Sequence, residues 1–122
     1  MSPAVRALRG ATTVDHDTPD QINERVGALV NEMLARNEVD KDDLISVIFT
    51  ATDDVTSMFP AAAARAVGLG DVPLLCAREL AIQGGTARCI RVLMHLSTER
   101  SRSELRHVYL AGAEGLRDDL PA

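Results

Sequence analysis

The sequence predicts an α+β fold, a single domain in which a mixed β-sheet is packed with helices. Three observations support this prediction. The chain has 122 residues, which fits one domain and leaves little room for a second. Residues 18–37 have the apolar spacing of one long helix. Shorter runs rich in aliphatic and β-branched residues precede and follow it, as expected for strands.

The first strand is expected at residues 4–14, where alternation places Arg9 on one face with Ala7 and Ala11. Residues 44–50 are almost continuously apolar, which is typical of a strand covered on both faces. Because a helix separates these two strands, we expect them to form a parallel pair joined by a right-handed crossover.

The long helix has a clear start. Thr18, Pro19 and Gln21 predict a capping box with proline at the first helical position. The helix should last until about Asn37. Its apolar side is made of residues at helical spacing: Ile22, Val26, Leu29, Val30, Met33 and Leu34.

The middle of the chain predicts a second helix and a short strand. Pro60 can open a helix over residues 61–67, and Gly68 can end it. Residues 72–76 read as a strand whose Pro73 favours a sheet edge or the first strand positions.

The last part begins with a turn at Gly84-Gly85 and a strand over residues 88–96. Residues 101–106 suggest a polar helical turn, residues 107–110 a further strand, and residues 112–122 a loop or short helix. One face of the 88–96 strand should be core, formed by Ile90, Val92, Met94 and Leu96. The other face carries Cys89, Arg91, Leu93 and His95.

Composition argues against several functions. The net charge is −5 and aromatic residues are 2%, which disfavours nucleic-acid binding by counterion release or base stacking. The longest stretch without a charged residue, 55–64, is about half of the roughly 20 residues of a membrane span. No export signal is expected, and Cys76 and Cys89 are expected to be reduced thiols, so we expect a cytoplasmic protein.

Arg91 is the most informative single residue. A guanidinium in the middle of an apolar strand needs an anionic or strongly polar partner, because leaving it unpaired costs several kcal/mol. One interpretation is a buried ion pair with Glu79 or another carboxylate, and the other is a site for an external anion. Twelve of the thirteen basic residues are arginine, which fits either a GC-rich genome or arginine forks that bind carboxylates.

Other candidates are ambiguous when taken one at a time. Cys76 lies near a strand end, where binding groups are common, yet a lone cysteine is more often a small core residue. Tyr109 can be a core ring. Phe59 can dock a helix whose Arg65 is solvated. The histidines are expected to be exposed or packed, and no zinc-type ligand spacing is present.

Taken together, five segments resemble the monofunctional chorismate mutases of the AroH type, in one register from about residue 5 to residue 120. They are residues 9–14 (RGATTV), 59–61 (FPA) with Arg65, 72–79 (VPLLCARE), 89–92 (CIRV) and 106–110 (RHVYL). The resemblance implies a homotrimer with a pseudo α/β barrel and an active site between each pair of adjacent subunits. It implies chorismate as substrate, its rearrangement to prephenate in aromatic amino acid biosynthesis, and no cofactor, metal or covalent intermediate.

The resemblance also implies residue roles. Arg91 would bind the ether oxygen and the side-arm carboxylate, and Arg9 and Tyr109 would bind carboxylates. Glu79 and Cys76 would bind the ring hydroxyl. The rest of the substrate-binding set is Phe59 and Leu75, Arg65 at the entrance, and Leu116 and Arg117 closing over the site from a tail, residues 112–122, that we expect to be mobile.

Two positions depart from the family pattern, Ala62 where some relatives carry a charge and Asp118 where relatives often have proline. Two other hypotheses are a non-catalytic trimeric sensor that binds an acidic metabolite and an imine deaminase of similar architecture. The sensor would bind without turnover, and the motifs of the deaminase are not those found here.

Overall fold

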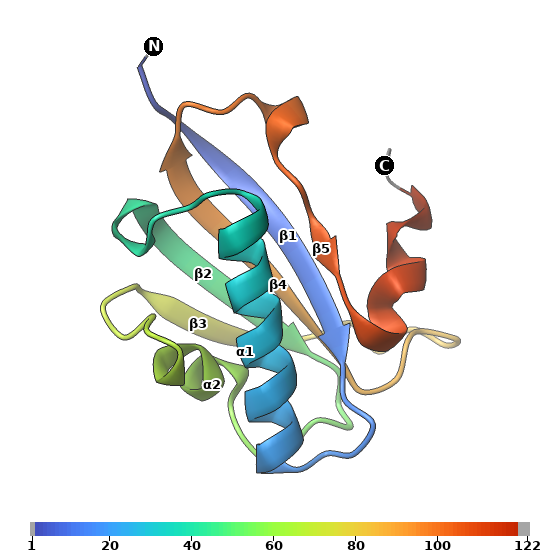
Figure 1. Cartoon of the computed structure of the whole chain (residues 1–122). Coiled ribbons are helices and arrows are strands. Elements are labelled where there is room, and N and C mark those ends of the chain that lie inside the picture. The colour runs from blue at the N-terminus through green and yellow to red at the C-terminus, as the bar shows by residue number, and fades with distance from the viewer. Residues whose placement is uncertain (1, 120–122) are drawn as a thin grey trace.

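The computed structural model describes residues 2–119 and contains one five-stranded sheet with two helices packed against it (Figure 1). The strand order is β3-β2-β4-β1-β5. The strands are β1 (Ala4–Thr13), β2 (Leu44–Ala51), β3 (Leu74–Arg78), β4 (Cys89–Thr98) and β5 (Val108–Tyr109). The helices are α1 (Pro19–Arg36) and α2 (Pro60–Ala66), with short 3-10 helices η1 (Lys41–Asp43), η2 (Arg102–Glu104) and η3 (Ala111–Asp119).

The α+β prediction is confirmed, but the expected pairing of β1 with β2 is wrong. Strand β4 lies between them and is antiparallel to both, so β1 and β2 run in the same direction without touching as a pair. The central position suits β4, because it can hydrogen-bond on both edges while its core side chains cover the helix side of the sheet.

The start of α1 differs in part from the predicted capping box. Thr18 Oγ1 accepts a hydrogen bond from the Gln21 N–H at 3.3 Å, as expected. The Gln21 side chain instead accepts from the N–H groups of Asp15 (2.7 Å) and His16 (3.2 Å). The chain turns before the helix and brings these two donors to Gln21, while the Thr18 N–H donates to the His16 carbonyl.

The two α-helices cover one face of the sheet. The predicted α1 residues and the predicted face of β4 are buried in one core cluster with Val47 and Phe49 of β2. The alternate residues of the strands lie on the other face, where Val5 is 65% and Leu75 63% exposed. The expectation that residues 44–50 are covered on both faces is therefore wrong for the single chain.

The remaining element predictions are confirmed in outline. Helix α2 begins at Pro60, and Gly68 follows it with a φ of 105°. Strand β3 is an edge strand that begins after Pro73. Ser101 and Glu104 form a reciprocal capping box around η2.

The end of α1 is tied to the segment that precedes β5. Asn37 is 1% exposed, and its side-chain amide donates to the carbonyls of Met33 (2.8 Å) and Arg106 (2.9 Å). Its Oδ1 accepts from the Arg106 N–H at 2.6 Å. One buried side chain therefore satisfies both polar groups of a main-chain residue near β5.

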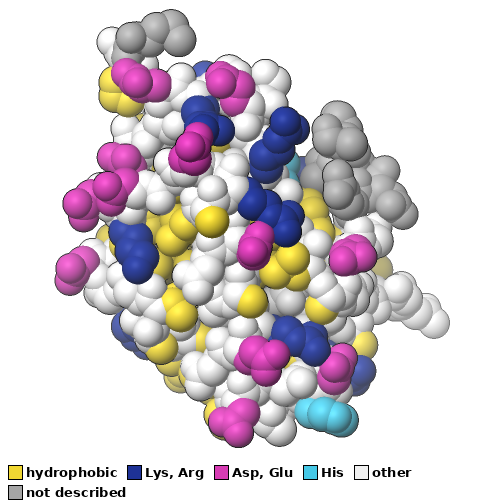
Figure 2. Space-filling view, in the orientation of Figure 1, with side chains coloured by type: hydrophobic (Ala, Val, Ile, Leu, Met, Phe, Trp, Pro, Cys, Tyr) yellow, Lys and Arg dark blue, Asp and Glu magenta, His cyan; other side chains and the backbone are white. Residues whose placement is uncertain are grey.

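Acidic and basic side chains are interspersed on the face that α1 presents (Figure 2). That face has no continuous basic surface of the kind that binds nucleic acid. Among the helices of residues 2–119, none is both long and apolar enough to cross a bilayer.

Candidate active site

A row of paired residues crosses the sheet at Arg91. In the strand register Arg91 pairs with Thr50 of β2 and with Ala11 of β1, and Ala11 pairs with Tyr109 of β5. Paired residues project from the same face of a sheet. Since the neighbours of Arg91 in β4, Ile90 and Val92, are buried under the helices, this row projects from the open face.

Arg91 forms an ion pair with Glu79, which agrees with one of the two interpretations of Arg91 drawn from the sequence. The distance from Arg91 Nε to Glu79 Oε1 is 3.4 Å. The hydroxyl of Thr50 donates a hydrogen bond to the other carboxylate oxygen, Glu79 Oε2. Glu79 follows the end of β3, and its N–H donates to the Ala51 carbonyl at 2.9 Å.

The burial expected for this pair is not found in the single chain. The Arg91 side chain is 46% exposed and that of Glu79 is 21% exposed. The physical reason is the alternation of β4, which places Arg91 on the face that no helix covers. A partly exposed guanidinium already held by one carboxylate can still meet a second anion from solvent.

Arg9 and Tyr109 lie on the same face. Arg9 pairs with Leu93, which makes it a diagonal neighbour of Arg91 at a spacing of about 7–8 Å. The Arg9 N–H donates to Nδ1 of His107 at 2.9 Å, which holds the segment leading into Tyr109. The arginine face is the part of this surface that carries Arg9, Glu79, Arg91 and Tyr109.

A cleft of about 790 Å³ lies elsewhere in the chain, between the loop after β2, the start of α2 and the end of β3. Phe59, Ala62 and Cys76 line it, and Phe59 is 71% exposed. Arg65 is exposed and three residues after Ala62, so it lies on the same side of α2. The cleft lined by Phe59, Ala62 and Cys76 is the Phe59 cleft, and Arg65 is not one of its lining residues.

Cys76 is not brought to the arginine face. It pairs with Phe49, which is fully buried, and packs against the core on the helix side of the sheet. Glu79 and Arg91 lie on the opposite side. A single chain thus divides the expected site residues into two groups, although the resemblance implies that Glu79 and Cys76 act on one hydroxyl.

The other expected residues are placed as follows. Leu75 pairs with Ile48 on the open face and is 63% exposed. Leu116 is half-buried in η3, which packs along β1 and β5. The side chains of Arg117 and Asp118 lie outside the described part of the structure, as do residues 120–122.

Sequence reasoning missed Asp17, which anchors the loop that carries Phe59. Its carboxylate accepts from the Thr56 N–H (2.9 Å), the Thr56 hydroxyl (2.7 Å) and the Ser57 N–H (3.1 Å). The hydrogen bonds from Thr56, followed by those from Ser57, lower the pKa of Asp17 to about 2. Its partners are 39 and 40 residues away in the sequence, so no local pattern could reveal them.

A second missed carboxylate, Asp54, organises the entry into β4. It accepts from the Thr52 hydroxyl, which is the main cause of its lowered pKa, and from the Arg88 N–H at 2.9 Å. Arg88 has a φ of 45°, which side chains other than glycine seldom adopt. The Thr52 hydroxyl also accepts from the Cys89 N–H at 2.9 Å, so this network fixes the start of β4, two residues before Arg91.

The two cysteines are at least partly buried, as are His95 and His107, whereas His16 is exposed as expected. Cys76 and Cys89 are free, and burial raises the pKa of Cys89. His107 accepts from Arg9, and Nδ1 of His95 lies 3.3 Å from the Ser46 hydroxyl. Within residues 2–119 no group of three or more potential ligands could hold a metal ion.

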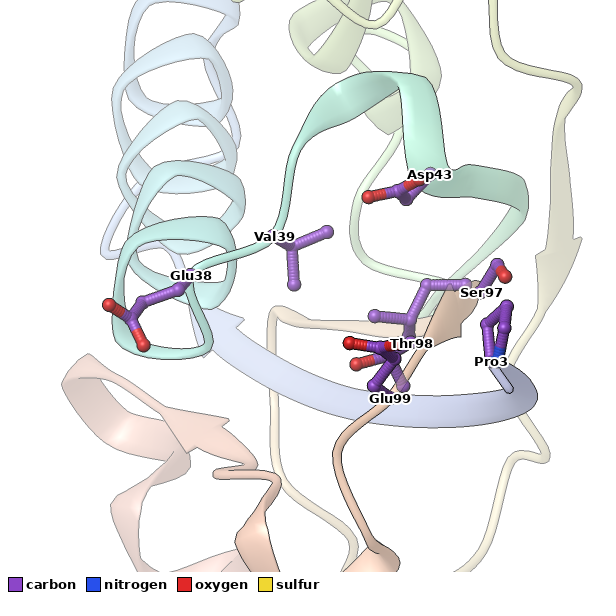
Figure 3. A pocket seen from close by; sticks show the side chains of 8 residues that line it. Pro3, Glu38, Val39, Asp43, Ser97, Thr98 and Glu99 are labelled. Atoms are coloured by element: carbon purple, nitrogen blue, oxygen red, sulfur yellow. The ribbon is translucent and has the colours of Figure 1, made fainter. Parts of the chain in front are cut away.

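A smaller pocket of about 300 Å³ lies at the other end of the sheet (Figure 3). Glu38, Asp43 and Glu99 line it, but Glu38 lies apart from the other two and pairs with Arg100. Its acidic lining is unsuited to the anion for which the arginine face is arranged.

The fold is that of an α+β protein, and the arginine face gives one side of its sheet charged groups suited to a small anionic ligand. The chain belongs to the chorismate mutase type I family, whose family model matches residues 5–120. It is 47% identical over 117 residues to chorismate mutase AroH of Thermus thermophilus, covering 95% of this chain and 96% of the relative. It is 37% identical to chorismate mutase AroH of Bacillus subtilis, with 95% and 92% covered.

A solved structure leads to the same family. The chain superposes on a chorismate mutase from Clostridium thermocellum with a TM-score of 0.88 and 43% identity, covering 90% of this chain and 98% of that one. The resemblance first seen in the five sequence segments is therefore confirmed. The sensor and deaminase hypotheses receive no support from these comparisons.

Proposed function

We propose that this chain is a chorismate mutase that converts chorismate to prephenate in aromatic amino acid biosynthesis, with residues 1–122 as one catalytic domain. The observation that carries the proposal is the arrangement of Arg91, paired with Glu79 and flanked by Arg9 on an open sheet face. Both relatives are named chorismate mutase AroH, and the match covers 96% and 92% of their sequences. No cofactor is needed, because the reaction is an intramolecular rearrangement.

The reaction requires a folded substrate and a stabilised ether oxygen. As the bond from this oxygen to the ring lengthens, negative charge develops on the oxygen, and a fixed guanidinium can stabilise that charge. Arg91 takes this role and also binds the side-arm carboxylate. Arg9 and Tyr109 bind carboxylates and hold the flexible arm over the ring, which removes much of the entropic barrier.

Glu79 supplies the complementary charge. Its carboxylate accepts a hydrogen bond from the ring hydroxyl and offsets positive character that develops on the ring. Its 3.4 Å ion pair with Arg91 keeps the two charges next to each other before substrate arrives.

We infer that the complete site lies between subunits of a homotrimer. The arginine face and the Phe59 cleft cannot meet within one chain, since Cys76 and Arg91 lie on opposite sides of the sheet. The cleft of the neighbouring subunit would bring Cys76 to the ring hydroxyl, Phe59 to the pocket wall and Arg65 to the entrance. Leu75 would complete the binding surface, and Leu116 and Arg117 would close over it.

The exposed apolar side chains favour this assembly. Leu80 is 82% and Ile82 is 68% exposed in the loop that follows Glu79, and Val5 and Leu75 are exposed on the open sheet face. A small domain gains core area when such surfaces associate. The free cysteines favour a reducing compartment, and we infer the cytoplasm.

The test of the activity is the loss of the ultraviolet absorbance of chorismate when only purified protein is added. Turnover without metal or cofactor is expected, with prephenate as the product identified by chromatography. Binding of chorismate by calorimetry without turnover would favour the sensor hypothesis instead. No binding and no turnover at millimolar chorismate would reject both.

A further inference from the structure

The carboxylate of Glu79 is held at both oxygens by different groups. Oε1 lies 3.4 Å from Arg91 Nε, and Oε2 accepts a hydrogen bond from the Thr50 hydroxyl. The main chain of Glu79 is fixed as well, through its N–H bond of 2.9 Å to Ala51. The direction of this carboxylate is thus set by three contacts with β2 and β4.

Thr50 is well placed to control this direction. It pairs with Arg91 in the register of β2 and β4, so both side chains project from the open face beside Glu79. Its side chain is half-buried, and its hydroxyl reaches a residue 29 positions away in the sequence. Valine and threonine both favour strands, so strand formation at position 50 does not require a hydroxyl. The group that threonine adds is the hydroxyl that donates to Glu79.

The shortest approach within the ion pair is the 3.4 Å between Arg91 Nε and Glu79 Oε1. A carboxylate that is free to rotate tends to form a two-point pair with arginine, which occupies two N–H donors in parallel. By holding Oε2, Thr50 opposes that rotation and leaves the terminal nitrogens of Arg91 available. Those donors are the ones that the ether oxygen and the side-arm carboxylate need.

We propose that Thr50 is a positioning residue for the mutase reaction. Its hydroxyl holds the Glu79 carboxylate toward the ring hydroxyl and keeps Arg91 from being fully engaged by Glu79. This inference rests on the proposed function and deepens it, since it assigns a role to a residue of β2 that acts through Glu79.

The experiment compares Thr50→Val, which removes the hydroxyl at nearly constant shape, with Thr50→Ser, which keeps it. Since a hydrogen bond to a charged group is lost, Thr50→Val should lower kcat about ten- to a hundredfold. Thr50→Ser should stay within about threefold of the native kcat, because the same donor is present. Thr98→Val, which removes another half-buried strand hydroxyl at the far end of β4, is the matched control.

A second pair of variants tests whether Thr50 acts through Glu79. In a Glu79→Ala background, Thr50→Val should change kcat by less than about twofold, because the partner of the hydroxyl is already gone. Light scattering and thermal unfolding of each variant separate this effect from loss of assembly or folding.

The outcomes distinguish this inference from the proposed function. A native chain that leaves chorismate unchanged overturns both. If the native chain is active and Thr50→Val keeps kcat within about twofold, the positioning role is wrong while the function stands. The role is also wrong if Thr50→Ser is as impaired as Thr50→Val, or if Thr50→Val is equally harmful without Glu79.

Discussion

At the scale of single residues, the half-exposed state of Arg91 determines what the site can do. A guanidinium sealed into a core would be fully engaged by its carboxylate, whereas the Arg91 side chain is 46% exposed next to Glu79. The pair fixes the direction of the arginine without consuming its hydrogen-bonding capacity. A guanidinium that is already oriented does not have to reorient when negative charge appears in the transition state.

Replacing Arg91 with alanine should therefore be severe for catalysis. We expect a loss of about 3–4 kcal/mol of transition-state stabilisation, or 10²–10³ in rate, measured as kcat/KM with chorismate. Arg36→Ala is a suitable control, because Arg36 forms a surface pair with Glu32 on α1, 2.6 Å apart and remote from the site. A variant at position 91 that keeps most of its rate would contradict the assigned role.

His107 should make the fold sensitive to mild acid. Burial, and to a lesser extent the charge of Arg9, lower the pKa of His107 from its ordinary value of 6.5. The unfolded chain then binds a proton more readily than the folded chain, so this stabilisation is complete above pH 6.5 and is lost as the pH falls through the folded pKa. Protonation of Nδ1 also removes the acceptor that holds the Arg9 N–H.

Urea unfolding between about pH 7.5 and about pH 5.5 tests this expectation. The native chain should lose more unfolding free energy over this range than His107→Asn, which has no titrating group at the position. Equal losses in the two proteins would show that His107 contributes nothing to the acid response.

Much of the residue-level site could be predicted, and what could not depends on contacts between distant segments. Arg91 and Glu79 stand out because charged residues in apolar runs need partners. Cys76 and Glu79 are three positions apart, and residues at an odd separation along a strand project from opposite faces. This signal for their separation is present in the sequence. The bonds of Asp17 to Thr56 and of Thr50 to Glu79 join loops and strands whose meeting only the fold determines.

At the scale of elements, local patterns predicted α1, α2 and the core face of β4 well. These patterns are repeated over many residues within one segment, so the sequence contains enough information to assign them. Strand order cannot be assigned in this way, because it depends on which strand edges pair between segments that are far apart in the sequence. The insertion of β4 between β1 and β2 had no local signal.

Asn37 should be important for docking the segment before β5 onto α1. Asn37→Ala leaves the N–H and carbonyl of Arg106 without their buried partner, so we expect a loss of about 2–4 kcal/mol in unfolding free energy. Asn23→Ala on the exposed side of α1 serves as a control and should change stability little. Denaturant unfolding measures both, and similar stabilities for the two variants would argue against this docking role.

At the scale of the whole molecule, the residues expected at the site are divided between the arginine face and the Phe59 cleft. Neither group holds all the residues that the family resemblance implies for the site, and the open sheet face carries exposed apolar side chains. The proposed association between copies would bring the two groups together and cover those side chains. Only the family resemblance predicts such an assembly, since no periodicity within one chain encodes a contact between chains.

Coexpression of two inactive variants tests the shared site directly. Arg91→Ala disables the arginine face, and Ala62→Trp fills the Phe59 cleft, which Ala62 lines. In mixed oligomers some sites combine an intact face with an intact cleft, so activity should return to about a quarter of the native level.

The same two variants purified separately and assayed together without exchange of subunits provide the control, and they should remain inactive. Absence of recovery in verified mixed oligomers would place the whole site within one chain.

The central position of β4 also bears on how the protein is made. A nascent chain leaves the ribosome with β1, α1 and β2 well before residues 89–98 are synthesised. Until then β1 and β2 lack the strand that joins them, and the apolar side of α1 has no finished sheet to cover. Folding should therefore begin late in translation and be limited by long-range pairing.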